Sequence, residues 1–240
     1  MISIVIPTLN EEKLLPQLLA QFPEDVRRRR DVELVVSDGG SSDGTRQIAA
    51  QHGAVVITHE HAHRQTIAEG RNSGAAAARG DVLVFINADI RISDVDLFFE
   101  EITRCLSRRG VAGVTAEVRV FPEEEILSDR IFHFCHNYYV RFLNRIGEGM
   151  GRGECQIVRR ADFTAVGGYN AAMVAGEDYD LFRRVRKRGK IVMMQRTVIY
   201  ESPRRFRKYG YVHIVWGWTR NALAVIFRNK SSSEEWEAVR

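Results

Sequence analysis

Two acids, two adjacent glycines and several hydroxyl residues follow a β-branched run in the stretch VVSDGGSSDGT, Val35–Thr45. Asp38 ends that run, so its carboxylate could accept hydrogen bonds from a nucleobase N–H or from hydroxyl groups. Gly39 and Gly40 permit a tight turn with positive φ and let the backbone approach a ligand closely. The candidates for capping the next helix, whose free N–H groups would favour an anion, are Ser41, Ser42 and Asp43. A plain strand-to-helix turn is the alternative.

Two further polar clusters stand directly behind short apolar runs. PTLNEE follows Ile2–Ile6, and INADI begins at the last residue of Val82–Ile86. The carboxyl ends of parallel strands meet at one edge of a sheet, and ligands of such sheets bind along that edge. The three clusters are therefore predicted to converge on one binding site.

The elements that must position these clusters are short apolar strands that alternate with helices. The predicted strands are Ile2–Ile6, Val32–Val36, Val55–Thr58 and Val82–Ile86, and the helices between them are Glu11–Gln21, Asp43–His52 and Gln65–Ala78. This alternation predicts an α/β fold with a mostly parallel, Rossmann-like sheet and helices on both faces.

The second half of the chain has a less regular pattern. Its predicted elements are a helix at Asp94–Arg108, a strand at Val111–Val120, a helix at Ile126–Ile146, a glycine-rich loop at Gly147–Glu154 and a strand at Cys155–Arg159. The segment GEDYDLFRRVRKRGK then predicts a loop that feeds a helix ending at Gly189.

Composition narrows the class of protein. The 240 residues, 45% of them hydrophobic, suffice for one domain with a full core, and the net charge of +4 favours anionic ligands only weakly. The run Arg27–Arg30 is typical of a solvated helix end, and no zinc-finger, basic-aromatic or RNA-binding signature is present, which argues against nucleic-acid binding.

The compartment is indicated by the cysteines and by the apolar runs. Cys105, Cys135 and Cys155 are widely spaced and form no CxxC, so we expect no disulfide framework, no zinc site and a reducing, cytoplasmic location. The start MISIVIPTLN lacks a basic n-region, and no run reaches the roughly 18 apolar residues of a membrane span, so neither a signal peptide nor a span is expected.

Four motifs together carry a resemblance to a known family. IVIPTLNEE, VVSDGGSSDGT, RNSGAAAARGDVLVFINAD and GEDYDLFRRVRKRG resemble, in order and spacing, the motifs of family 2 glycosyltransferases, which are inverting enzymes of the GT-A fold. The resemblance covers about residues 2–205. The chain also looks like a bacterial subgroup in which SPRRF and an apolar C-terminal helix follow the ED motif.

The resemblance implies a role for each matching residue. Asp38 matches the carboxylate that bonds the base, usually uracil, and Arg71 lies in a stretch that often meets the nucleotide or diphosphate. Asp89 matches the last acid of the metal-binding DxD element, and Asp178 matches the catalytic base. The remaining positions implied at the nucleotide site are Pro7, Thr8, Asn10, Glu11, Gly39, Asn87 and Ala88.

The chemistry of inverting sugar transfer calls for these residue types. Mg²⁺ or Mn²⁺ held by Asp89 and the diphosphate would neutralise the charge that develops on the leaving nucleotide. Asp178 would take the proton of the acceptor, and Glu177 beside it could raise the pKa of Asp178 or orient it, or could only favour the helix dipole. Asn87 replaces the first acid of DxD and cannot neutralise a metal, so metal binding is weaker or a third ligand lies elsewhere.

Three basic or histidine-bearing segments allow two readings each. Arg204 and Arg205 of SPRRF, in a loop after Pro203, could bind the donor diphosphate or an acceptor phosphate, or form a solvated turn. HEHAH, His59–His63, could bind a metal or be a variable connection. His213 could be a distant metal ligand or a packing residue of a helix face.

Three parts of the chain follow from these patterns: a GT-A domain at residues 1–205, an apolar helical segment at 206–230 and a polar tail at 231–240. The helix could cover the core, join a second copy, or lie on a membrane surface with its tryptophans and flanking cations as anchors. Tyr138 and Tyr139, in the aromatic segment before the glycine-rich loop, would suit sugar or lipid acceptors as well as a core.

The leading hypothesis is a cytoplasmic, metal-dependent inverting glycosyltransferase that uses a UDP-sugar, or else a GDP-sugar, and that could lie peripherally on the inner face of the membrane. Its acceptor, a hydroxyl or phosphate that could be lipid-linked, is unassigned. The alternatives are a nucleotide-sugar-binding protein without activity, suggested by Asn87, and a sugar-phosphate nucleotidyltransferase, whose usual GxGTR-type loop is absent from IPTLNEE.

Overall fold

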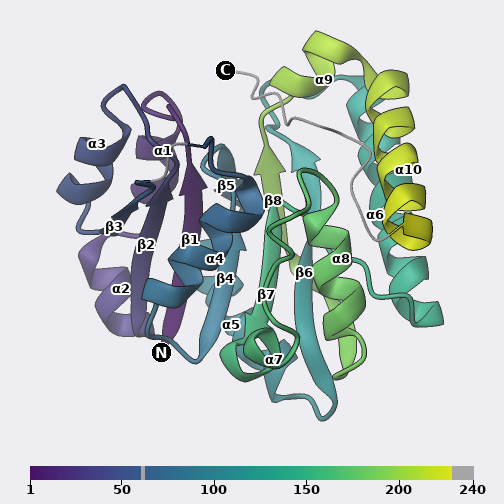
Figure 1. The fold of residues 1–240 in the computed structure, drawn as a ribbon, viewed down its shortest axis with the longest axis horizontal. Coiled ribbons are helices and arrows are strands. Elements are labelled where there is room, and N and C mark those ends of the chain that lie inside the picture. The colour runs from purple at the N-terminus through teal and green to yellow at the C-terminus, as the bar shows by residue number, and fades with distance from the viewer. Residues whose placement is uncertain (61–62, 229–240) are drawn as a thin grey trace.

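The computed structural model describes residues 1–60 and 63–228, the last eight of these by their backbone alone. Their eight strands form one sheet with helices on both faces (Figure 1). The strands are β1 (Ile2–Thr8), β2 (Val32–Asp38), β3 (Val55–Thr58), β4 (Val82–Ile86), β5 (Ile90–Ile92), β6 (Val111–Val120), β7 (Cys155–Arg159) and β8 (Lys190–Glu201). The helices are α1 (Leu15–Leu19), α2 (Glu24–Arg30), α3 (Thr45–Gln51), α4 (Ile67–Ala77), α5 (Val95–Ser107), α6 (Leu127–Ile146), α7 (Arg160–Ala165), α8 (Glu177–Val185), α9 (Arg204–Tyr209) and α10 (Tyr211–Arg228).

The order of the strands, β3-β2-β1-β4-β7-β6-β8-β5, confirms the expected α/β architecture. The first four strands in this order pair in parallel, so the ends of β1, β2 and β4 meet at one edge. β7 runs antiparallel to β4, with Cys155 opposite Ile86, and β8 runs parallel to β6. The start of β7 and the end of β8 therefore join the same edge.

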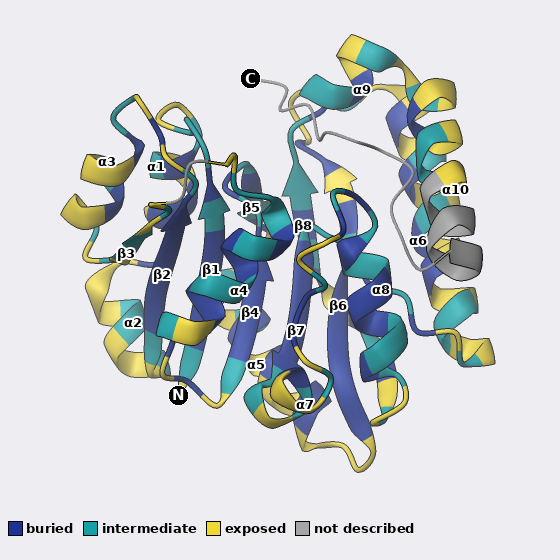
Figure 2. Cartoon of the chain, viewed as in Figure 1, coloured by how far each residue is buried: buried dark blue, intermediate teal, exposed yellow. Residues whose placement is uncertain are grey.

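Alternation along the strands builds a core on each face of the sheet. Ile4 and Ile6 of β1 pack with α1 and α5 on one face, whereas Val5 packs with α4 and α8 on the other. The central strands are accordingly buried along their length (Figure 2). This two-sided packing holds the carboxyl ends of the strands at fixed positions.

The predicted helix at Glu11–Gln21 is shorter than expected, and a second helix follows it. α1 spans five residues with Pro16 in its first turn, where the missing N–H of proline costs no hydrogen bond. Pro23 stands at the N-cap of α2, which the sequence analysis did not predict. The arginines of α2 lie in its last turn, and none of the residues of this helix is buried, as expected of a solvated helix end.

The turn after β2 also differs in detail from the prediction. Only Gly40 of the glycine pair has a positive φ, at 96°. The N-cap of α3 is Gly44, so neither serine nor Asp43 occupies that position. Asp43 instead accepts hydrogen bonds from the N–H groups of Thr45 and Glu12, at 3.0 and 3.3 Å, and so links the turn to the loop after β1.

A buried carboxylate joins α6 to the C-terminal helices. Asp129 of α6 is fully buried and accepts hydrogen bonds from Arg207 and from the hydroxyl of Tyr211. Burial alone would raise the pKa of Asp129, but these hydrogen bonds and that of the Ile126 N–H lower it to about 2. Arg204 and Arg205, expected in a loop, lie in α9, because Pro203 occupies an N-cap instead of only ending a strand.

No helix in residues 1–60 and 63–228 is long and apolar enough to cross a membrane. His213 is exposed on α10, with its ring stacked on Tyr209 at 5.9 Å. The centre of HEHAH, at His61, and the predicted tail at residues 231–240 lie outside the described residues. His59 and His63 are described, and their rings are 4.9 Å apart.

Candidate active site

A cavity of about 420 Å³ opens at the carboxyl edge of the sheet. The loops after β1 and β4, the residue before β7, the end of β8 and the helices α9 and α10 line it. Nine predicted site residues are in its wall: Pro7, Thr8, Glu11, Gly39, Asn87, Ala88, Asp89, Arg204 and Arg205. Five others stand behind the wall: Asn10, Asp38, Arg71, Glu177 and Asp178.

Asp38 fastens the turn that follows it. Its carboxylate is fully buried and accepts hydrogen bonds from the N–H groups of Gly40 and Ser41, at 3.1 and 2.8 Å, and from the hydroxyl of Thr8 at 3.2 Å. Asn10 ties the β1 loop to the same turn, because its side-chain oxygen accepts from the N–H of Ser42 at 2.8 Å. In this arrangement the turn, and not the Asp38 carboxylate, faces the cavity.

Asp89 and the first arginine of α9 form a charged bridge across the cavity. The guanidinium of Arg204 lies 3.0 Å from the Asp89 carboxylate and 3.2 Å from that of Glu11. Arg205 lines the same cavity, and burial lowers the pKa of its guanidinium. The sequence-distant SPRRF segment thus lies against the predicted DxD turn.

Arg71 connects the two halves of the predicted catalytic machinery. Its side chain is 2% exposed and donates to Glu177 at 3.0 Å, to the Asn87 side-chain oxygen at 3.1 Å and to the Gly153 carbonyl at 2.7 Å. The guanidinium also lies over the ring of Tyr169, 5.2 Å from its centre. Asn87, at the first DxD position, therefore acts here as a neutral acceptor for a buried arginine.

The acidic pair of the GED motif opens α8. Burial and the neighbouring Asp178 raise the pKa of Glu177 to about 7, although Arg71 opposes this change. Burial likewise raises the pKa of Asp178, whose carboxylate accepts a hydrogen bond from the N–H of Tyr179 at 2.8 Å. A Cβ at Gly153 would lie 2.9 Å from the Asp178 carboxylate, so the glycine-rich loop lies directly on this acid.

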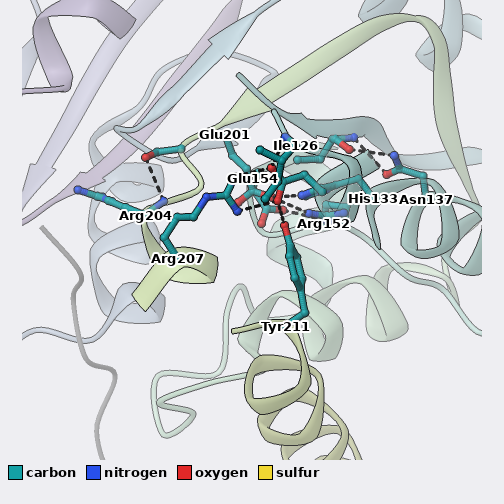
Figure 3. Close-up of polar contacts among 12 residues, drawn as sticks. Ile126, His133, Asn137, Arg152, Glu154, Glu201, Arg204, Arg207 and Tyr211 are labelled. Atoms are coloured by element: carbon teal, nitrogen blue, oxygen red, sulfur yellow. Dashed lines mark hydrogen bonds and ion pairs between the residues drawn. The ribbon is translucent and has the colours of Figure 1, made fainter. Parts of the chain in front are cut away.

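The sequence analysis missed a second group of charged residues in the cavity. Glu154 and Glu201 line it, and Arg152 behind them donates to both, at 3.1 and 3.0 Å (Figure 3). Glu201 is the last residue of β8 and lies at the same edge of the sheet as Asp38. The rule that placed Asp38 there, an acid at the carboxyl end of a strand, could also have identified Glu201. Glu154 stands at the end of the predicted glycine-rich loop, where only the antiparallel pairing of β7 brings it to the edge.

Metal ligands are few among the described residues. No group of three histidines, cysteines or acids in residues 1–60 and 63–228 is arranged to hold a metal ion. Asp89 nevertheless has its carboxylate in the cavity wall. One carboxylate together with phosphate oxygens of a substrate is a common ligand set for Mg²⁺, so the residues present fit a cation that is bound jointly with a nucleotide.

Several solved structures share this architecture. A mannosyltransferase of Pyrobaculum calidifontis, in complex with GDP-Man and Mn²⁺, superposes with a TM-score of 0.67 at 18% identity, covering 84% of this chain and 56% of that one. Glucosyl-3-phosphoglycerate synthase of Mycobacterium tuberculosis, in complex with Mn²⁺ and UDP-glucose, gives 0.62 at 22% identity, covering 94% and 77%. These likenesses confirm the GT-A fold.

Curated relatives point the same way in sequence. A 4,4'-diaponeurosporenoate glycosyltransferase of Staphylococcus haemolyticus is 28% identical over 93% of this chain, which spans 61% of that protein's length. A glucosyl-3-phosphoglycerate synthase of Mycolicibacterium paratuberculosis is 35% identical over 37% of this chain and 28% of its own. Residues 3–167, more than half of the chain, match the sequence pattern that defines glycosyl transferase family 2. The chain therefore belongs to that family.

Proposed function

We propose that this protein is a metal-dependent inverting glycosyltransferase that moves a sugar from a nucleotide diphosphate sugar to an acceptor hydroxyl or phosphate. One observation carries the proposal. Asp89, the arginines of α9 and the Glu177–Asp178 pair converge at one edge of the sheet, in or directly behind the wall of one cavity. Cation-binding, anion-binding and proton-accepting groups are the three that the reaction needs.

The nucleotide would lie against the loop after β1 and the turn after β2, and its diphosphate against Arg204 and Arg205. Guanidinium groups bind phosphate oxygens through paired hydrogen bonds. This assigns a function to the SPRRF segment that marks the bacterial subgroup. A UDP-sugar is the favoured donor and a GDP-sugar the second, which is supported by the nucleotide sugars bound to the structural relatives.

Asp89 would hold Mg²⁺ or Mn²⁺ together with the diphosphate. The cation would neutralise charge on the departing nucleotide. The guanidinium of Arg204 is shared between the carboxylates of Asp89 and Glu11, so a cation on Asp89 would compete with this arginine and release it to the diphosphate.

Asp178 would accept the proton of the acceptor hydroxyl. Burial raises the pKa of Asp178, and a carboxylate with a raised pKa accepts a proton more readily than an aspartate with the usual pKa. Arg71 and Glu177 would hold the first turn of α8 against the DxD turn. Asp178 is half-buried, and a side chain at position 153 would press on its carboxylate, so glycine suits this position of the loop.

The test is turnover of UDP-glucose, UDP-N-acetylglucosamine and GDP-mannose by the purified protein with Mg²⁺ or Mn²⁺. Slow release of free nucleotide from one of these donors is expected even without an acceptor, since water can replace it. Tight binding without any release would favour the binding-only alternative, and release of pyrophosphate would favour a nucleotidyltransferase. No binding and no release would contradict the proposal.

We also propose that α6 and α10 contact the cytoplasmic face of an anionic membrane. Large apolar side chains of α6 are exposed, among them Phe134 at 73%, Tyr138 at 68% and Phe142 at 51%, and Trp216 of α10 is exposed at 68%. The single acid of α6, Asp129, is buried, and the sequence of α10, residues 211–228, holds two arginines and no acid. Aromatic anchors with positive charge and no exposed acid suit an anionic lipid surface.

This contact predicts lipid-dependent binding. The protein should co-sediment with phosphatidylcholine vesicles only when they contain phosphatidylglycerol, and salt should weaken the binding. Phe134→Ser combined with Phe142→Ser should abolish it, whereas Val55→Ser, at an exposed apolar position on β3, should not. A concentration-dependent dimer that these two serine substitutions disrupt, without vesicle binding, would assign the face to a second copy instead.

A further inference from the structure

Two carboxyl groups line the cavity next to the predicted DxD turn, since Cys155 is opposite Ile86 and Glu201 is opposite Ile90. Glu154 and Glu201 arrive there from neighbouring parts of the sheet, one before β7 and the other at the end of β8. Their side chains are 15% and 13% exposed, so each is largely enclosed and still reaches the cavity. The proposed catalytic chemistry uses neither residue.

Arg152 holds this pair in one geometry. Its Nε donates to Glu154 at 3.1 Å and its Nη2 to Glu201 at 3.0 Å. The backbone N–H of Arg152 donates to the hydroxyl of Thr115. Burial raises the pKa of Glu154, but the charge and hydrogen bond of Arg152, together with a backbone hydrogen bond, lower the pKa to about 2. Burial and the charge of Glu154 raise the pKa of Glu201 well above the usual value. The pair thus offers carboxyl oxygens that one arginine holds in fixed positions.

The same cluster contains buried polar atoms without partners. Arg152 is 2% exposed and His133, on α6, is 1% exposed. The Nη1 of Arg152 and both ring nitrogens of His133 make no hydrogen bond within the part of the chain that the structure describes. His133 Nε2 lies 3.8 Å from the Glu201 carboxyl (Figure 3). Buried polar atoms of this kind leave hydrogen-bonding capacity directly behind the carboxyl pair.

An aromatic wall lies next to the carboxyl pair. Phe206 and Trp218 line the cavity, with ring centres 6.5 Å apart, and the ring of Phe206 is 5.5 Å from that of His133. Aromatic faces cover the apolar C–H faces of a ring, while acids bind its hydroxyls. Phosphate is disfavoured here, because two acids repel it and the arginines of α9 attract it elsewhere in the cavity.

We propose that Glu154 and Glu201, bridged by Arg152, form a subsite that recognises the hydroxyl groups of a neutral sugar ring whose apolar face lies against Trp218. This inference rests on the proposed function and deepens it. Carboxyl oxygens accept hydrogen bonds from ring hydroxyls, and two carboxyl groups held by one arginine recognise hydroxyls at fixed positions. The ring belongs either to the donor or to a glycosylated acceptor.

The test uses Glu201→Ala, which keeps the Arg152–Glu154 ion pair, and Glu154→Gln. The affinity for bare UDP and GDP should stay within about twofold of the wild type. The gain in affinity from the sugar of UDP-glucose, UDP-N-acetylglucosamine or GDP-mannose should fall about tenfold in the variants, as for loss of a charged hydrogen bond. Glu123→Ala, an exposed acid outside the cavity, is the control.

Methyl α-glucoside and methyl α-mannoside, titrated into free and nucleotide-loaded protein, separate the two sources of the ring. If the variants lose the affinity that the sugar adds to nucleotide binding, the subsite holds the sugar of the donor. If the affinity for the nucleotide sugar is unchanged and the affinity for the methyl glycoside falls, the subsite holds a glycosylated acceptor. If Glu201→Ala is folded and changes neither affinity, the subsite is refuted. If the wild type binds no nucleotide, the proposed function fails, and the glycoside titration of free protein decides the subsite alone.

Discussion

Replacing Asp178 by asparagine is expected to lower the rate of sugar transfer about 10²–10⁴-fold while the affinity for the nucleotide stays unchanged. An amide has nearly the shape of the carboxylate but accepts no proton. Asp178 lies behind the cavity wall, under Gly153, so the change touches no residue at the nucleotide loops. Rates with saturating donor and nucleotide titrations of the same preparations separate the two effects.

Asp180→Asn is the matched control, because it also removes a carboxylate from α8. Asp180 pairs with Arg184, away from the cavity, so this variant should lose stability without a comparable loss of rate. Full turnover by Asp178→Asn would contradict the assignment of the base. Loss of nucleotide binding together with turnover would mean that Asp178 is a structural residue of the helix terminus.

Replacing Arg71 by methionine should reduce the free energy of unfolding by about 3–5 kcal/mol, the usual cost of leaving a buried ion-pair partner unpaired. Arg71 is 2% exposed, and its removal leaves Glu177, at 10% exposure, without its cation. The Asn87 side-chain oxygen and the Gly153 carbonyl lose their donor as well. Urea unfolding followed by circular dichroism measures the change.

The double variant Arg71→Met with Glu177→Gln distinguishes a structural from a ligand-binding arginine. Removing both charges should recover part of the lost stability, since the remaining amide is cheaper to bury than an unpaired carboxylate. A nucleotide contact by Arg71, which the family resemblance implies, predicts the opposite pattern: unchanged stability and weakened nucleotide binding. That outcome would show that the buried pairing is not its main role.

Local patterns predicted six of the eight strands in the described residues, because each of the six is a short run rich in β-branched residues, and they missed β5 and β8. Val55–Thr58, Val82–Ile86 and Val111–Val120 have the predicted bounds, and Asp38 ends β2 as expected. Proline was harder to interpret. Pro16, Pro23 and Pro203 each stand at the start of a short helix, because proline costs no hydrogen bond there, and such helices are too short for a periodic pattern to reveal.

The sequence predicted which residues of the candidate site lie at the carboxyl ends of strands, but not how their side chains are oriented. The positions of Asp38 and Asp89 follow from the ends of their strands. The orientation of a side chain does not: the buried Asp38 carboxylate is held by N–H groups of its own turn. Arg152 and Glu201 meet across 49 residues of sequence, and no local pattern contains that contact.

The measurement that tests the central claim most directly is calorimetric titration of UDP and then GDP into the wild type and Asp89→Ala, each with and without Mn²⁺. The account predicts that one nucleotide binds the wild type in a Mn²⁺-dependent way and that Asp89→Ala removes this dependence. Absence of nucleotide binding under every condition, by a wild type with cooperative unfolding, would contradict it. Binding that is equally strong with and without Mn²⁺ in both proteins would contradict the metal role of Asp89.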